Sequence, residues 1–249
     1  MLSSKNRAII ASAGSRKTTF LVEKALAIHE KPVLITTYTN ENVSQIREYI
    51  VQKKGHVPAN VEVTSWFGLL LRDGVRPYQN YMTRKPRIDS INFRDTPAPG
   101  IGKGDVDRYF LDRGNNVYRD RVADFVCQCD IRSKGLIVRR LENIFGHILI
   151  DEFQDFAGYD LEFVERLCTS TIEVLVACDP RQGTYSTHIS AKNSRFRRVG
   201  ILGWLQQKKA SGLLVIESAP TVSGATRQFA ISRMRYSRIF RRLDPGTTK

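Results

Sequence analysis

The stretch ILIDEFQDF, residues 148–156, decides the fold that the sequence predicts. Its first three residues are apolar and typical of a buried parallel strand, and two adjacent carboxylates, Asp151 and Glu152, follow directly. Because ligands of parallel sheets bind beyond the carboxyl ends of the strands, both acids are expected at the active edge. There they are suited to hold Mg²⁺ and to polarise an attacking water. The same pattern is also typical of a helix start or a solvated turn, so a second motif has to decide.

That second motif lies near the amino terminus. An expected strand at residues 7–11 runs into ASAGSRKTT, residues 11–19, and then into a helical pattern. Strand, small-residue loop, Lys-Thr and helix is the arrangement of a phosphate-binding loop. Backbone N–H groups at the helix start would hold the phosphates, while Lys17 adds a cation and Thr18 a hydroxyl for Mg²⁺. The expected ATP-binding residues are Ala11, Ser12, Ala13, Gly14, Ser15, Arg16, Lys17, Thr18 and Thr19.

The loop departs from the general pattern GxxxxGK[ST], which has glycine where this chain has Ala11 and Arg16. Ala11 is a mild change. Arg16 places a Cβ atom and a long cation where the backbone comes closest to the phosphates, so it either slows turnover or adds useful charge. A Ser/Lys-rich turn that caps an ordinary helix remains the alternative for this segment.

Five segments, in their order and spacing, resemble the UvrD/Rep-like group of superfamily 1 DNA helicases. They are ASAGSRKTT, VLITTYTNENVSQI (33–46), VTSWFGLLL (63–71), ILIDEFQDF and VLVACDPRQGTY (174–185). The resemblance covers about residues 7–185, and the DExQD form of the acidic motif is its most distinctive part. It implies the N-terminal ATP-binding domain of such a helicase. The implied fold is α/β, a RecA-like P-loop NTPase whose parallel sheet has flanking helices and a short helical or irregular insertion.

The resemblance also assigns roles to polar residues of these motifs. It implies that Lys17 and Thr18 bind the β- and γ-phosphates and Mg²⁺, and that Asp151 holds the metal through water. It implies that Glu152 polarises the attacking water, and that Gln182 senses the γ-phosphate and couples it to the DNA groove. Lys17, Glu152 and Gln182 are thus the expected catalytic residues, and ATP and Mg²⁺ the cofactors. We expect the two motifs to meet at one triphosphate across neighbouring parallel strands.

The segment TTYTN, residues 36–40, follows an apolar strand, and in the family that the chain resembles it binds single-stranded DNA. A ring at Tyr38 can stack on any base, and the neutral polar side chains beside it can donate to phosphate oxygens. SWFG, residues 65–68, is expected on the same groove. The expected DNA contacts are Tyr38, Thr39, Asn40, Ser65, Trp66 and Tyr185.

Core packing is the alternative for the aromatic residues of these segments. Tyr38, Trp66 and Phe67 are all consistent with a buried ring, and for Phe67 the core is the preferred interpretation. Tyr185 aligns with an aromatic residue that the family places near DNA, and both interpretations stay open for it.

The charge of the chain favours a polyanionic partner. Its 249 residues carry a formal net charge of +14, which promotes nucleic-acid binding by counterion release and predicts strong salt dependence. Basic residues gather at residues 195–198 and 232–242, although a run of charges is also typical of a solvated face. The expected partner is single-stranded DNA or a single-strand/duplex junction.

The sequence shows no apolar run of membrane-spanning length, and the first residues lead into a strand rather than a signal peptide, so a cytoplasmic protein is expected. Cys127, Cys129, Cys168 and Cys178 lack CxxC spacing. Buried free thiols are therefore expected rather than a zinc site or disulfides.

Strands and helices alternate along most of the chain, which predicts a parallel sheet. Residues 73–140 interrupt this alternation and are interpreted as the insertion. The expected domains are a RecA-like ATP-binding domain at residues 1–210 and a basic C-terminal tail at 211–249. Within the tail, residues 231–243 have the spacing of an amphipathic basic helix.

The family that the chain resembles has a second RecA-like domain, and the roughly 60 residues after Tyr185 are too few for one. The expected function is therefore the ATP- and DNA-binding portion of a UvrD-like helicase. It would hydrolyse ATP to drive translocation and unwinding once a second domain or a partner protein completes it. The alternative is a non-motor, nucleotide-gated DNA-binding switch, or a degenerate remnant with negligible hydrolysis.

Overall fold

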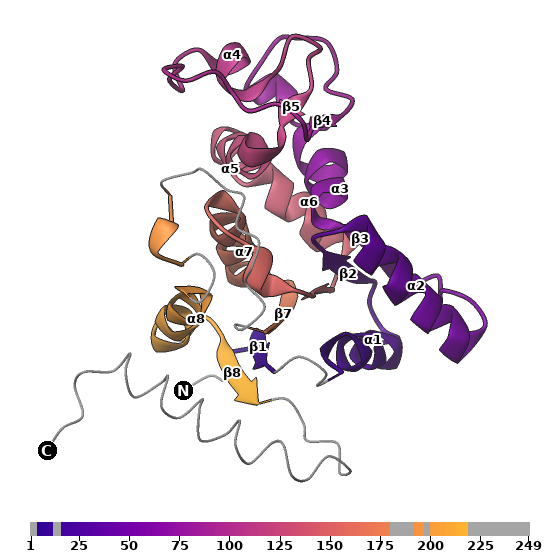
Figure 1. Cartoon of the computed structure of the whole chain (residues 1–249). Helices are drawn as coiled ribbons and strands as arrows, with labels where there is room; N and C mark the ends of the chain where they lie inside the picture. The colour runs from indigo at the N-terminus through magenta and orange to yellow at the C-terminus, as the bar shows by residue number, and fades with distance from the viewer. Residues whose placement is uncertain (1–3, 12–15, 180–191, 197–199, 219–249) are drawn as a thin grey trace, which may run out of the picture.

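The computed structural model describes residues 4–11, 16–179, 192–196 and 200–218 (Figure 1). Six parallel strands form one sheet in the order β3-β2-β6-β7-β1-β8. The strands are β1 (Arg7–Ile10), β2 (Val33–Thr37), β3 (Val61–Ser65), β6 (His147–Ile150), β7 (Glu173–Cys178) and β8 (Val215–Ser218). The fold-class prediction, a parallel α/β sheet of the RecA-like P-loop type, is confirmed.

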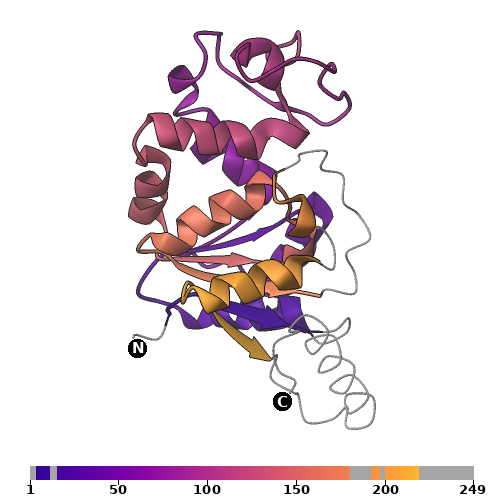
Figure 2. The same ribbon diagram turned by 90° about the vertical axis from the view of Figure 1, so that its left-hand side faces the viewer.

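Helices cover both faces of this sheet, and Figures 1 and 2 show the resulting layers. The covering helices are α1 (Lys17–Ala27) and α2 (Asn40–Lys54) on one face, and α7 (Tyr159–Thr169) and α8 (Ile201–Ala210) on the other. Neighbouring residues of β2 serve different layers, because Ile35 packs in the cluster of α1 and α2 whereas Leu34 belongs to the larger core on the opposite face. All of β2 is buried, as expected for a strand covered on both sides.

The chain between β3 and β6 forms the insertion, whose outer part lies at one end of the molecule in Figure 1. Its elements are α3 (Trp66–Leu69), the π-helix η1 (Leu70–Val75), η2 (Gln79–Tyr81), β4 (Ile91–Asn92), α4 (Val106–Phe110), β5 (Val117–Tyr118), η3 (Arg119–Arg121), α5 (Val122–Arg132) and α6 (Leu136–Ile144). Gly74 lets η1 approach α5, since a Cβ atom there would lie 2.7 Å from the Cγ2 atom of Val126. The insertion is thereby packed against the helical layer through α5 and α7.

Two features after β7 correct the expected domain boundary at residue 210. Helix α8 and strand β8 were not predicted, and β8 pairs with β1, with Ala8 opposite Ile216. Residues 215–218 are therefore part of the sheet rather than of a basic tail. The expected helix at 231–243 lies outside the described residues.

The four cysteines are free and buried, as expected. Burial raises the pKa of each thiol, to about 12 for Cys168 and Cys178, so these groups stay protonated at neutral pH. Within the described ranges, no helix is both long and apolar enough to span a bilayer.

Candidate nucleotide-binding site

The expected phosphate loop joins β1 to α1, and the structure describes both ends of it. Ala11 is buried, and its N–H donates to the carbonyl oxygen of Cys178 at 3.1 Å, which ties the loop start to the end of β7. Arg16 is exposed and directly precedes α1 with φ 58° and ψ 35°, the left-handed region. A non-glycine residue there costs roughly 1–2 kcal/mol. Ser12, Ala13, Gly14 and Ser15 lie outside the described residues.

The first turn of α1 and the end of β6 meet. The hydroxyl of Thr18 donates to Oδ2 of Asp151 at 2.5 Å. Beside it, Nζ of Lys17 lies 3.7 Å from Oδ2 of Asp179, and both side chains are almost fully buried. The Lys-Thr pair and the first acid of ILIDEFQDF thus converge in space, although 133 residues separate Thr18 from Asp151 in sequence.

The expectation that this meeting spans neighbouring strands is wrong, because β7 lies between β1 and β6. The reason is visible at the end of β7, where Asp179 follows the strand and pairs with Lys17. The intervening strand therefore contributes a carboxylate of its own to the site. Asp179 was not among the expected site residues, although it lies in the segment VLVACDPRQGTY, one of the five that carry the resemblance.

The acidic motif is held by its own backbone and by Gln154. The N–H of Asp151 continues the sheet by donating to the carbonyl oxygen of Thr36 at 2.9 Å. Glu152 then adopts the left-handed region with φ 51°, a conformation that concentrates at functional sites. Nε2 of Gln154 donates to the Glu152 carboxylate, and Oε1 of Gln154 accepts from the N–H of Asp179 at 2.9 Å. Gln154 thereby orients Glu152 and connects the acidic motif to the end of β7.

Negative charge is crowded in this site. Burial raises the pKa of Asp151, and the nearby Glu152 carboxylate adds to the rise, while the hydrogen bond from Thr18 opposes it. A hydroxyl and a buried carboxylate are hard oxygen donors of the kind that Mg²⁺ prefers. In the part of the chain that the structure describes, no group of three or more His, Cys, Asp or Glu side chains forms a complete metal site. Mg²⁺ is commonly bound through one or two protein ligands and substrate phosphates, so the oxygen atoms of Thr18 and Asp151 fit this ion.

Asp155 gives the site a pH dependence that stability measurements can detect. Burial and the neighbouring Glu152 raise the pKa of Asp155 to about 6, against the opposing effect of Lys17. Because the pKa of Asp155 is raised in the folded state, ionisation of this group lowers the free energy of unfolding. The loss grows as the pH rises from the ordinary pKa of an aspartate towards about 6 and is complete above that pH. We expect Asp155→Asn to melt about 2–4 °C above the parent at pH 8, and by a smaller margin at pH 5. Melting curves at both pH values measure this, and equal margins would contradict the raised pKa.

The residues expected to contact DNA lie after β2 and β3. Tyr38 is half-buried, with its ring centroid 4.9 Å from that of Phe67, and burial raises the pKa of its hydroxyl. Thr39 and Asn40 are exposed, and the Thr39 hydroxyl oxygen accepts from the N–H of Asn42 at 3.2 Å to cap α2. The oxygen of Ser65 is used similarly, as acceptor for the N–H of Gly68.

Trp66 does not fit the expectation of a DNA contact. Its side chain is 0% exposed, and its ring lies against Phe156 and Phe163 with centroid distances of 4.8 and 5.9 Å. The indole N–H donates to Oδ1 of Asp160 at 2.8 Å, so even its polar atom is satisfied inside the protein. The ring is therefore a core anchor for α7, and Phe67 is buried as well, as the preferred interpretation predicted. Gln182 and Tyr185 lie outside the described residues.

Helix α8 packs against the apolar residues of the acidic motif through Trp204. This helix was not expected from the sequence. Trp204 is 1% exposed, and its ring centroid lies 5.5 Å from that of Phe153. Phe153 in turn packs on Phe156 at 5.2 Å. The two apolar residues of DEFQDF are thus held between the sheet core and α8, which fixes the turn that carries Glu152.

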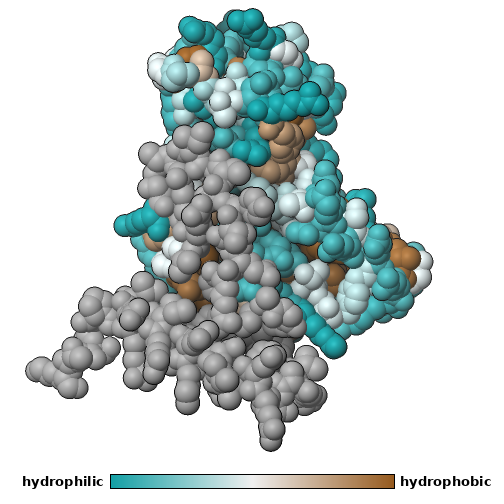
Figure 3. Space-filling view, in the orientation of Figure 1, coloured by the Kyte–Doolittle hydropathy of each residue, from teal (hydrophilic) through white to brown (hydrophobic). Residues whose placement is uncertain are grey.

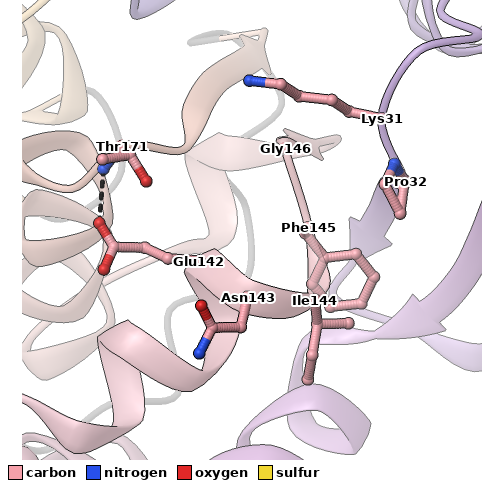
Figure 4. Close-up of a pocket in the computed structure, with 8 residues that line it drawn as sticks. All are labelled: Lys31, Pro32, Glu142, Asn143, Ile144, Phe145, Gly146 and Thr171. Carbon is pink, nitrogen blue, oxygen red and sulfur yellow. Dashed lines mark hydrogen bonds between the residues drawn. The ribbon is translucent and has the colours of Figure 1, made fainter.

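A small cavity lies away from this site (Figure 4). It measures about 140 Å³, and its lining includes Pro32 and Gly146, which directly precede β2 and β6, and Thr171, two residues before β7. The cavity is therefore at the amino ends of the strands, opposite the edge that carries Lys17 and Asp151. Figure 4 shows the Glu142 carboxylate turned to the backbone N–H of Thr171, a hydrogen bond of 2.7 Å that closes one side.

Comparison with known proteins agrees with this geometry. Residues 117–196 match the family model of the UvrD/REP helicase N-terminal domain. The matched segment runs from β5 through the acidic motif, α7 and β7 to η5 (Ser194–Phe196). Lys17 and Thr18 lie outside it in sequence, but the fold brings Thr18 into contact with Asp151 of the matched segment. A search of curated proteins gave no match. The family match supports a helicase-like role with ATP binding. The match shows that residues 117–196 are similar to a UvrD-like helicase N-terminal domain, and the six-stranded parallel sheet agrees with this similarity.

Proposed function

We propose that this chain binds ATP with Mg²⁺ and single-stranded DNA as the N-terminal portion of a UvrD-like helicase. It hydrolyses ATP to drive translocation and unwinding when a second RecA-like domain or a partner protein completes the site. The observation that carries this proposal is the 2.5 Å hydrogen bond from Thr18 to Asp151, beside the buried Lys17. It joins the expected phosphate loop to the expected acidic motif at one sheet edge.

Each residue of the site has a task in this proposal. Lys17 neutralises the β- and γ-phosphates, and its low exposure strengthens that interaction because little water screens it. Thr18 and Asp151 hold Mg²⁺, which when bound supplies charge compensation for the transferred phosphoryl group. Glu152 orients and polarises the attacking water, and its hydrogen bond with Gln154 keeps the carboxylate in one position.

The backbone of residues 11–19 is proposed to hold the phosphates through its N–H groups. Its last residues, Lys17, Thr18 and Thr19, lie in the first turn of α1, where the helix dipole favours anions. Gln182 is proposed to sense the γ-phosphate, and an arginine from the completing domain to stabilise transition-state charge. Such an arginine contributes roughly 10³- to 10⁵-fold in related phosphoryl-transfer systems, so we expect slow hydrolysis by this chain alone.

One observation favours the second candidate function, a nucleotide-gated DNA-binding switch with negligible hydrolysis. Arg16 occupies a left-handed position directly before Lys17, where the general loop pattern has glycine. Its side chain is exposed and free to approach a bound phosphate. An additional cation at that place favours tight nucleotide binding over rapid turnover.

DNA binding is assigned in this proposal to the polar residues after β2 and β3. Thr39 and Asn40 are exposed at the positive end of α2, and Ser65 is the last residue of β3 on the same edge of the sheet. Tyr38 offers part of its ring beside them. Tyr185 is kept as a proposed contact, whereas Trp66 is not, because its ring is buried.

The test of the proposed function is ATP hydrolysis by the purified chain with and without an oligo-dT strand, at roughly 50 and 200 mM salt. We expect slow hydrolysis that DNA stimulates at the lower salt concentration and much less at the higher one. Lys17→Ala is the control that removes nucleotide binding. Equal stimulation at both salt concentrations would contradict the electrostatic basis of DNA binding, and robust unwinding by the chain alone would contradict the need for a completing domain. ATP binding with undetectable hydrolysis would favour the switch.

A further inference from the structure

Phe93 exposes a large aromatic ring in the insertion, directly after β4. It is 54% exposed, more than any other large hydrophobic side chain in the described part of the chain. It lies outside the segment that matches the helicase family and outside every motif on which the resemblance rests. An exposed phenylalanine of this kind calls for an explanation, because burial of such a side chain would gain roughly 1.5–3 kcal/mol.

The ring of Phe93 extends a row of aromatic rings that begins at the proposed DNA-binding edge. Its centroid lies 5.2 Å from that of Phe67, with the planes at 87°, and Phe67 in turn lies 4.9 Å from Tyr38. Phe67 is buried between the two, so Tyr38 and Phe93 are the members with accessible surface. Figure 3 shows an apolar patch within largely hydrophilic surface just below β4 and β5, where the insertion meets the rest of the chain.

The backbone around Phe93 is fixed by Asn92. The side-chain oxygen of Asn92 accepts from the N–H groups of Arg94 at 2.9 Å and Asp95 at 3.0 Å, which closes a tight turn around the phenylalanine. The side-chain nitrogen of Asn92 donates to Asp112 at 2.7 Å, which anchors this turn to the chain leading into β5. Phe93 is therefore presented by an ordered turn, so binding to it costs little conformational entropy.

Charged residues of both signs follow the ring in sequence, Arg94 and then the exposed Asp95. Arg94 is the next residue and is exposed. Strands β4 and β5 run parallel with Asn92 opposite Tyr118, so Arg119 is the residue after the one that pairs with Asn92. Arg119 forms one ion pair, with Asp120 at 3.1 Å, and remains half-exposed. An exposed aromatic ring with a cation beside it is suited to single-stranded nucleic acid, because the ring stacks on a base and the cation attracts the backbone.

We propose that Phe93 stacks on a base of single-stranded nucleic acid and thereby extends the path from Tyr38 onto the insertion. This inference rests on the proposed function, since it assumes that a single strand runs along the carboxyl edge of β2 and β3. The net charge of +14 favours this occupant over an apolar protein segment. The stacking tolerates any base because every base has a π face.

The test is the affinity of the full chain for a fluorescently labelled oligo-dT strand, measured by anisotropy at low salt. We expect Phe93→Ala and Phe93→Leu to weaken binding by roughly 5- to 150-fold, as the loss of one base–aromatic stack implies. Phe93→Trp should bind as the parent does or more tightly. Tyr81→Ala is the matched control, because Tyr81 is an exposed aromatic residue of the same insertion, 43% exposed, and lies beside Tyr78 rather than in this row.

A strand that carries abasic sites in place of its bases separates stacking from an effect on the fold. Phe93→Ala should bind this abasic strand as well as the parent does, because there is no base left to stack. Equal weakening on both strands would overturn the inference, as would unchanged oligo-dT binding by Phe93→Ala while DNA still stimulates ATP hydrolysis. In the latter case the proposed function stands without this contact. If the parent itself binds no single strand, the DNA-binding part of the proposed function fails and this inference fails with it.

Discussion

Glu152→Gln is expected to lower ATP hydrolysis by roughly 10²- to 10⁴-fold while ATP binding is retained, as the loss of a positioned general base implies. The substitution keeps the size of the side chain, and its amide oxygen can still accept the hydrogen bond from Gln154. The left-handed backbone at this position also has no reason to change. The loss should therefore be confined to polarisation of the attacking water.

Because hydrolysis by this chain is expected to be slow, the rate is best measured in single turnover with the protein in excess. ATP affinity is measured separately with a fluorescent ATP analogue in the presence of Mg²⁺. Glu173→Gln is a suitable control, because Glu173 begins β7 at the opposite edge of the sheet and is exposed. Parental hydrolysis by Glu152→Gln would show that another group positions the water, whereas parallel loss of binding and hydrolysis would place Glu152 among the ligands of the nucleotide.

Asn6→Asp is expected to destabilise the fold by about 3–5 kcal/mol, a large part of the stability of an ordinary domain. Asn6 is 3% exposed and directly precedes β1. Its side-chain nitrogen donates to the carbonyl oxygens of Cys168 at 2.8 Å and Leu213 at 3.0 Å, and its oxygen accepts from the N–H of Val174 at 3.0 Å. In the variant, a buried carboxylate oxygen would face two carbonyl oxygens. Two hydrogen bonds would be lost, and electrostatic repulsion between oxygen atoms would replace them.

Urea denaturation with an unchanged m-value measures this loss. The loss should shrink at low pH, because a protonated carboxyl group can again donate to one carbonyl. Asn143→Asp makes the same chemical change at an exposed position of α6 and should alter stability by less than about 0.5 kcal/mol. A similar small effect at Asn6 would mean that this side chain does not secure β1 in the sheet.

The central strands could be predicted from sequence because their signal is local. The expected strand at residues 7–11 forms β1 (Arg7–Ile10), and the apolar residues 148–150 before Asp151 lie in β6, as expected. A run of Val, Ile and Leu that stops at a polar residue marks the end of a buried strand regardless of the rest of the chain. The convergence of Thr18 and Asp151 could be expected for the same reason, since parallel strands deliver their carboxyl ends to one edge.

The features that sequence did not reveal depend on partners far along the chain. The position of Trp66 after β3 is as consistent with a groove as with the core, and the acceptor that secures its burial, Asp160, lies 94 residues away. Strand β8 is a short segment next to turn residues, and only its pairing with β1 defines it. Asn6 has an ordinary polar side chain in sequence, and its three backbone partners come from two distant segments.

Strand β1 lies between β7 and β8, and this arrangement has a consequence for synthesis on the ribosome. Strand β1 is synthesised before β7 and β8, and Asn6 must wait for Leu213, its hydrogen-bond partner 207 residues later in the chain. During that interval both edges of β1 lack their neighbours, and unpaired edges of nascent strands invite wrong pairing. Lys17 and Thr18, which come soon after β1 in the chain, therefore reach Asp179 and Asp151 only after most of the described chain has been synthesised.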